Sequence, residues 1–340
     1  MEQQKTLDEV GEFGLIDILT KKFKTTKSTI KGVGDDCAVL ELNKKEYQLI
    51  TTDLLLEGIH FDLVYSPLKH LGYKAVIANA SDIYAMNGTP QKMTVSIGVS
   101  AKFSVNALEQ LYEGILLACE RYNIELIGGD TSASLTGLTI SITMIGTVAK
   151  ESIVYRDHAK ATDLICVSGD LGGAYAGQQI LQREKAVFNQ GKGAQPKLEG
   201  YEYVVGRTLK PEGRRDILEE LAKQQITPTS MIDVSDGLSS DLLHLCIESH
   251  VGCKIYEEKI PINENTANAC KEFSMEPIIS ALHGGDDYEL LFTIPLSQYE
   301  AIKKVPDVSV IGNIVDAGEG LGMISRSGDY VHLKAQGWNL

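Results

Sequence analysis

The sequence predicts a two-domain protein of the α/β or α+β class, and three observations support this. The chain has 340 residues, and at roughly 150 residues per domain this length suggests about two domains. Short stretches that favour strands occur in both halves. They are interleaved with longer stretches that have the apolar periodicity of amphipathic helices. We therefore expect a first domain over residues 1–150 and a second over residues 151–340.

The first half mixes predicted helices and strands. The helix at the start depends on Leu15, Leu19 and Phe23, which recur every four residues. The expected elements are a helix over 10–23, a glycine-acidic turn over 32–40, a strand over 47–53, a helix over 69–86, and strands over 93–99 and 138–144. Between the last two strands we expect an amphipathic helix with Ser104 as its N-cap.

The second half repeats this mixture without a fixed period. The expected elements are a strand over 163–169, a helix through Leu181, an exposed polar loop over 183–200, strands over 230–236, 253–258 and 288–294, and a helix over 238–250. The turn GDLGGAYAG (169–177) opens a helix directly after a strand. Its backbone N–H groups could bind an anion, but close packing of helix on strand explains the glycines equally well.

Charge and composition exclude several classes of protein. Lys and Arg total 32 against 46 Asp and Glu, a net charge of −14 that disfavours a nucleic-acid partner. No apolar run approaches the roughly 20 residues of a membrane span, and residues 1–10 lack the features of a secretory signal. We expect a cytoplasmic protein. The six cysteines form no C-x-x-C pair and are expected to be buried thiols rather than a zinc site.

Aspartates recur at expected strand ends or in glycine turns, where ligands bind in such folds. They are Asp35, Asp36, Asp53, Asp82, Asp130, Asp233, Asp236, Asp286 and Asp287. A single aspartate of this kind is more often a turn or helix cap than a ligand, but so many of them favour a shared site. Converging carboxylates repel one another unless some are protonated or cations bind among them. With Thr51 and Thr52 beside Asp53, the all-oxygen set suits Mg²⁺.

Motifs of other nucleotide-binding and hydrolytic sites are absent from the sequence. It has no G-x-x-x-x-G-K-[ST] and no G-x-G-x-x-G after a strand. His60 and His283 have no accompanying G-x-S-x-G, so a hydrolytic triad is disfavoured. Metal ions and Arg156 are then the candidates for neutralising phosphate charge. Trp338, near the C-terminal end of the sequence, is more often a packing or terminal residue than a stacking platform.

The motifs, taken in order, resemble those of the thiamine-monophosphate kinases, which belong to the ATP-binding superfamily that includes aminoimidazole-ribonucleotide synthetase. The resemblance covers nearly the whole chain. It rests on GEFGLI (11–16), GVGDDCAVL (32–40), TTDLLLEGIHF (51–61), NASDIYAMNGTP (79–90), LIGGDT (126–131), IDVSDGLSSDL (232–242) and HGGDDYEL (283–290). Two segments depart from the usual pattern: HGGDDYEL stands where SGGEDYEL is common, and VYRDHA (154–159) where a TRSGA-like run is common.

The resemblance implies a two-domain fold in which N-terminal strands form a homodimer interface and the C-terminal domain closes over ATP. It implies transfer of the γ-phosphoryl group of ATP to thiamine monophosphate, assisted by several Mg²⁺ ions and without a general base. The implied metal ligands are Asp36, Thr51, Thr52, Asp53, Asp82, Asp130, Asp233 and Asp236. The implied ATP contacts are Tyr112, Gly129, Asp130, Arg156 and Ser235. The implied contacts to thiamine monophosphate are His60, Asp286 and Trp338.

Two alternatives remain beside this kinase. One is a sister ATP-dependent synthase of the superfamily. A selenophosphate synthetase is expected to carry a reactive Cys near its start, and a hydrogenase-maturation relative to end in Cys, whereas here the first cysteine is Cys37 and the sequence ends in GWNL. The other is a non-catalytic module that binds divalent metal or nucleotide.

Overall fold

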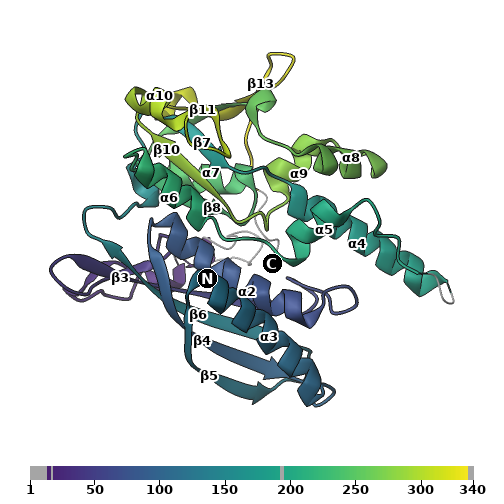
Figure 1. Cartoon of the computed structure of the whole chain (residues 1–340). Helices are drawn as coiled ribbons and strands as arrows, with labels where there is room; N and C mark the ends of the chain where they lie inside the picture. The colour runs from purple at the N-terminus through teal and green to yellow at the C-terminus, as the bar shows by residue number, and fades with distance from the viewer. Residues whose placement is uncertain (1–13, 17, 192–194, 336–340) are drawn as a thin grey trace, which may run out of the picture.

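The structure, a computed structural model, describes residues 14–16, 18–191 and 195–335. These residues form two β-sheets, one from each half of the sequence, with helices packed between and around them (Figure 1). This arrangement confirms the predicted mixed α/β class. Within the described ranges, no helix combines the length and the apolar character that a bilayer crossing requires.

The N-terminal sheet has six strands in the order β1-β2-β3-β6-β4-β5. They are β1 (Thr29–Lys31), β2 (Ala38–Glu41), β3 (Glu46–Leu56), β4 (Thr89–Val99), β5 (Glu125–Ala133) and β6 (Thr139–Ala149). Neighbours pair antiparallel except β4 and β5, which are parallel and joined through a helix. Val95 and Ile142 pair across β4 and β6 and are both buried, as the alternating pattern predicted. β5 is an edge strand whose residues are all exposed.

Helices α2 (Leu68–Ala85) and α3 (Val105–Tyr122) cover one face of this sheet (Figure 1). Ser104 caps α3 as predicted, because its hydroxyl accepts the Ala107 N–H at 3.2 Å. Two glycines let the helices approach closely. A Cβ at Gly72 would lie 2.0 Å from the Leu111 carbonyl oxygen, and one at Gly114 would lie 1.8 Å from the Lys69 carbonyl oxygen. This close packing fixes the position of α2.

The C-terminal sheet has seven strands in the order β13-β12-β9-β11-β7-β10-β8. They are β7 (Leu164–Ser168), β8 (Ser230–Val234), β9 (Gly252–Tyr256), β10 (Glu289–Ile294), β11 (Val308–Val315), β12 (Leu321–Ile324) and β13 (Tyr330–His332). Its helices are α4 (Gly173–Gln190), α5 (Glu202–Leu209), α6 (Arg215–Lys223), α7 (Leu238–Glu248), α8 (Glu264–Glu272), α9 (Pro277–His283) and α10 (Tyr299–Ile302). The predicted strands and helices of this half, apart from the end of α4, lie where the sequence indicated.

One apolar core continues from the first half into the second. Helix α2 packs on β3, β4 and β6 and also touches β8 and β10. Ile77 and Ile83 of α2 therefore share a cluster with Met231 of β8 and Phe292 of β10. Helix α2 is therefore buried on both sides and packs against both sheets. We still propose domains at 1–150 and 151–340, a division that falls in the connection between the two sheets.

Several boundaries differ from the predictions. The expected loop over 183–200 is wrong at its start, because α4 continues to Gln190. The strong helix formers after Leu181 extend α4, and ion pairs of Arg183 with Glu272 and of Lys185 with Asp62 hold it to other elements. Asp53 and Asp130 lie inside β3 and β5 rather than at strand ends, and Asp82 lies within α2. Of the expected helix over 10–23, the described residues 14–16 and 18–20 are helical.

Candidate active site

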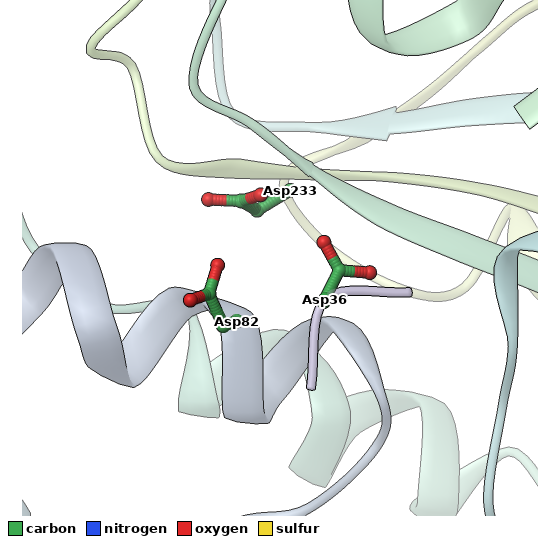
Figure 2. A group of neighbouring side chains, drawn as sticks. All are labelled: Asp36, Asp82 and Asp233. Carbon is green, nitrogen blue, oxygen red and sulfur yellow. The ribbon is translucent and has the colours of Figure 1, made fainter. Parts of the chain in front are cut away.

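Three predicted aspartates, Asp36, Asp82 and Asp233, meet where the two halves of the chain face each other. Asp36 lies in the turn before β2, Asp82 on α2 and Asp233 on β8. One carboxylate oxygen from each lies within 4.8 Å of the others. Figure 2 shows the three side chains directed toward one another from three separate elements. Asp36 and Asp233 are buried and Asp82 is half-buried, so the fold brings three acidic groups together in a region largely shielded from solvent.

Two hydroxyl groups and a fourth carboxyl surround the three aspartates. The Thr51 hydroxyl, from β3, donates to Asp82. The Ser81 hydroxyl, from α2, donates to Asp233 at 2.5 Å. Asp53 lies two residues after Thr51 on the same face of β3, and its charge raises the pKa of Asp82. These groups offer only oxygen atoms, which is the donor set that Mg²⁺ prefers.

The pKa values in this group are raised because burial disfavours charge and because the carboxylates repel one another. Burial, followed by the charge of Asp36, raises the pKa of Asp233 to about 7. Burial alone raises the pKa of Asp53 to about 6. Burial and the charges of Asp53 and Asp233 hold the pKa of Asp82 well above its usual range. Such carboxylates are stable at neutral pH only when protonated or when a cation binds among them.

Arg156 supplies a positive charge at one side of the group. It begins a short 3₁₀ turn (Arg156–His158) after the N-terminal sheet. Its guanidinium forms a two-pronged ion pair with Asp36, with Nε donating to Oδ2 at 3.1 Å. Burial opposes the Arg156 charge, but Asp36 outweighs it and the pKa of Arg156 is raised. The Ser249 hydroxyl donates to the Arg156 carbonyl at 2.9 Å, which anchors the backbone.

A cavity of about 400 Å³ opens beside the aspartates and contains several of the other predicted residues. It is lined by Asp53, Asp82 and Asp233 and, from the segments around them, by His60, Ser235, Asp236 and Asp286. Smaller cavities that share His60 and Asp286 extend it toward Tyr175 and Gln178 of α4. A larger groove of about 720 Å³ on the C-terminal sheet contains none of the predicted site residues. The cleft next to the aspartates is therefore the candidate active site.

Adjacent residues of the segment HGGDDYEL have opposite roles. Asp286 lines the cleft, with its N–H donating to the Ser235 carbonyl at 2.8 Å. Asp287 points into the C-terminal half, where its carboxylate accepts the N–H groups of Gly172 at 2.6 Å and Ala174 at 3.3 Å. The N-terminus of α4 thus binds a carboxylate of the chain itself. The backbone N–H groups of the glycine turn at 169–177 therefore do bind an anion, and that anion is the Asp287 side chain.

Three predicted residues, Gly129, Asp130 and Tyr112, lie away from the three aspartates, and a fourth, Thr52, lines the cavity beside them although its hydroxyl has another partner. The Thr52 hydroxyl lies beside that of Thr143, on the sheet face opposite Thr51. Gly129 and Asp130 lie on the edge strand β5. Asp130 pairs with Ser96 rather than with buried Val95, so it shares the uncovered face of the sheet. Tyr112 packs on the apolar core through α3. A fifth, Trp338, lies outside the described residues.

The structure adds three residues that the sequence analysis did not single out. Ser81 contacts Asp233, and its position directly before Asp82 is the sequence feature that could have identified it. Asp241, buried in the first turn of α7, accepts the N–H groups of Asp236 and Gly237 at 3.2 and 3.1 Å and so shapes the loop beside the cleft. Lys74, buried on α2, donates to Asp286 at 2.8 Å. The sequence feature that could have identified Lys74 is its position as the single charged residue in the apolar stretch LGYKAVIANA.

The chain is similar over most of its length to proteins of one enzyme family. A family model described as AIR synthase related protein, N-terminal domain, matches residues 34–148. The thiamine-monophosphate kinase of Aquifex aeolicus is 36% identical over 315 residues, covering 93% of this chain and 94% of that protein. The Bacillus subtilis enzyme of the same name is 31% identical, covering 87% of each. A solved structure described as AaThiL complexed with AMPPCP and TMP is 33% identical with a TM-score of 0.81, covering 96% of this chain and 97% of that one.

Proposed function

The chain belongs to the thiamine-monophosphate kinase family, and we propose that its aspartate-lined cleft transfers the γ-phosphoryl group of ATP to thiamine monophosphate. The products are thiamine diphosphate and ADP. The observation that carries the proposal is the meeting of Asp36, Asp82 and Asp233 from three separate elements. A related protein, 33% identical, has been solved with AMPPCP and TMP, which supports ATP as the co-substrate.

Mg²⁺ fits the residues of the cleft. Asp36, Asp82 and Asp233 would hold such ions, with Asp53, Asp236 and Thr51 completing the set. The raised pKa values of Asp233 and Asp53 support this assignment, because these carboxylates lack enough positive charge in the protein alone. Bound Mg²⁺ would neutralise the charge of the phosphate oxygens during transfer.

The residues of the cleft bind and position the reactants rather than exchange protons. The attacking atom is an oxygen of a phosphate that is already anionic, so no general base is required. Transfer then depends on alignment of the two phosphates and on shielding of their charge. Arg156 and Ser235 are placed to contact ATP, one beside Asp36 and the other at the rim of the cavity. His60 and Asp286 line the other end, which we assign to thiamine monophosphate.

We assign Asp130, Gly129 and Tyr112 to the ATP site of a second copy of the chain. Asp130 and Asp53 lie on opposite faces of the sheet and three strands apart, a separation of about 14 Å in the plane. The edge strand β5 exposes Leu126 and Ile127, and an exposed apolar edge favours pairing with another chain. We propose a homodimer through this edge, so that Asp130, Gly129 and Tyr112 can reach the partner's ATP.

The oligomeric state tests this part separately. Ile127→Lys places a charge on the β5 edge without touching the described aspartates. We expect light scattering to give twice the chain mass for the wild type and the chain mass for the variant. A monomeric wild type would remove the homodimer and leave the roles of Asp130 and Tyr112 without support.

The reaction itself is tested by measuring both products. Purified protein is incubated with ATP and Mg²⁺, with and without thiamine monophosphate, and ADP and thiamine diphosphate are quantified together. We expect the two products in equal amounts and only when Mg²⁺ is present. ADP without thiamine diphosphate would instead indicate a sister ATP-dependent synthase. Binding of ATP without release of ADP would indicate a non-catalytic module.

A further inference from the structure

Lys74 is a buried cation at the thiamine end of the proposed cleft. Its side chain is 7% exposed, and its Nζ donates to Asp286 Oδ2 at 2.8 Å. An ammonium is buried at a high free-energy cost unless it is paired. The neighbouring buried positions of α2 are otherwise uncharged, from Leu71 to Ser81. The one charged side chain of this buried stretch therefore contacts a carboxylate that lines the substrate cavity.

Asp286 is held rigidly in this pair. Its second oxygen, Oδ1, accepts the Tyr288 hydroxyl at 2.8 Å. Asp286 and Tyr288 both have left-handed backbone conformations, with φ of 60° and 52°, which non-glycine residues adopt at a free-energy cost. Each carboxylate oxygen thus has one donor and can accept another. The Asp286 side chain is 41% exposed, toward cavities that it shares with His60.

The position of Lys74 assigns it to the part of the substrate far from the transferred phosphate. Lys74 and Asp82 are on the same helix, separated by about two turns or 12 Å along its axis. The Lys74 ammonium balances the charge of Asp286, and the other carboxylate that lines this end of the cleft, Asp236, is one that we assign to the metal ions. Burial lowers the pKa of His60, and the opposing charges of Asp286 and Lys74 act on that pKa in opposite directions. A neutral end with a fixed acceptor suits an N–H donor better than a phosphate or a free cation.

We propose that Lys74 is a positioning residue that fixes the orientation of the Asp286 carboxylate as an acceptor for the exocyclic amine of the pyrimidine ring of thiamine monophosphate. The inference rests on the proposed function, since it assigns one end of that substrate. It adds a specificity element: an analogue with a carbonyl oxygen in place of the amine would meet the carboxylate with a second acceptor. Without Lys74, Asp286 keeps only the Tyr288 hydroxyl as a donor and can turn away, and the distinction between amine and carbonyl is lost.

The test compares Lys74→Met with Lys74→Arg and with the matched control Lys69→Met. Lys69 lies on the same helix but is 52% exposed and pairs with Glu113. Thiamine monophosphate and its 4-oxo analogue, oxythiamine monophosphate, are the two acceptors. For the wild type, Lys74→Arg and Lys69→Met we expect kcat/KM to favour the amine by at least about tenfold. In Lys74→Met the preference falls to within about threefold, KM for thiamine monophosphate rises about tenfold, and KM for ATP is unchanged.

A purely structural role predicts a different pattern, in which both acceptors and ATP are affected together and the preference for the amine survives. That result would overturn the inference. Should Lys74→Met fail to fold because it leaves Asp286 unpaired, Lys74→Met/Asp286→Asn removes both charges, and we expect it to fold and to lose the preference. A wild type that forms thiamine diphosphate but does not distinguish the two acceptors also rejects the inference and leaves the proposed function intact. A wild type that forms none rejects the proposed function itself.

Discussion

Two groups of buried carboxylates in this chain differ in how their charge is balanced. In the cleft, Asp36, Asp82 and Asp233 lie within 4.8 Å of one another, and among the described residues Arg156 is the cation in direct contact with them. In the C-terminal half, Glu289 is equally buried but pairs with two arginines, Arg207 at 2.8 Å and Arg214 at 2.5 Å. The Ser168 hydroxyl donates to the same carboxylate.

The difference separates a binding site from a structural ion network. Glu289 has donors on both oxygens and joins β10 to α5 and to the segment before α6. Nothing further is required for its charge to be stable. The cleft carboxylates are stable at neutral pH only with added protons or cations, as their raised pKa values indicate. Burial alone is common to both groups, so missing counter-charge is the feature that indicates a ligand.

Removing one cleft carboxylate should have the largest effect, and it should fall on activity. We expect Asp82→Asn and Asp233→Asn each to lower kcat by at least about 10³-fold, because loss of a metal ligand removes several kcal/mol of transition-state stabilisation. The unfolding free energy without metal should stay equal or rise, since repulsion is relieved. Steady-state kinetics and urea unfolding measure the two quantities. A kcat within tenfold of the wild type would reject the metal assignment.

Removing Glu289, the carboxylate whose charge two arginines balance, should instead affect stability. Glu289→Gln leaves the buried guanidinium groups of Arg207 and Arg214 without their shared partner. We expect the unfolding free energy to fall by about 3–5 kcal/mol. The matched control is Glu300→Gln, whose exposed pair with Lys303 is screened by water, so that we expect little change in the unfolding free energy. Equal urea midpoints for the two variants would contradict the comparison.

In metal-free protein, the pH dependence of the unfolding free energy should reveal the unbalanced charge of the cleft carboxylates. The folded-state pKa of Asp233 is about 7, above the ordinary value of about 4 for an unfolded aspartate. Between these values the folded state binds more protons than the unfolded state, so stability falls as pH rises. We expect Asp233→Asn to reduce the loss of unfolding free energy between pH 5 and pH 7.5 by about 1–3 kcal/mol, in EDTA. The same slope in both proteins would show that Asp233 titrates normally.

The smallest effect should come from removing one of the hydrogen-bond donors to Glu289. Ser168→Ala removes a hydroxyl that donates to Glu289 and accepts the Leu290 N–H at 2.8 Å. The two arginines still neutralise Glu289, so we expect a loss of about 1–2 kcal/mol in unfolding free energy. Product formation should keep its kcat/KM. A large loss of activity with unchanged stability would mean that this network takes part in the reaction.

Local patterns predicted most of the fold. Alternation predicted β4 and β6, an amphipathic pattern and Ser104 predicted α3, and short apolar runs predicted β7 and β8. The error at 183–200 came from reading polar residues as a loop. Those residues form the polar side of α4, held by partners such as Glu272 and Asp62 that are distant in the sequence. A single window of sequence contains no information about such partners.

The sequence predicted which residues belong to the candidate site but not how they are arranged in space. Asp36, Asp82 and Asp233 were identified, but only the fold shows that they meet. Asp286 and Asp287 are adjacent and chemically identical, and a reversal of backbone direction sends one to the cleft and the other to the N-terminus of α4. Asp130 belongs to a similar glycine motif, yet the register of β5 places it on the uncovered face. These outcomes depend on pairings between segments far apart in the sequence.

Direct measurement of bound divalent ions tests the central claim, that missing counter-charge makes the cleft a metal site. Mn²⁺ is titrated into metal-free protein at pH 7.5, and free Mn²⁺ is followed by electron paramagnetic resonance. For the wild type and Glu289→Gln, under conditions where both are folded, we predict at least one bound ion per chain with a Kd tighter than about 1 mM. For Asp82→Asn and Asp233→Asn we predict much weaker binding. Equal Mn²⁺ binding by the wild type and both cleft variants, or none by the wild type, would contradict the account.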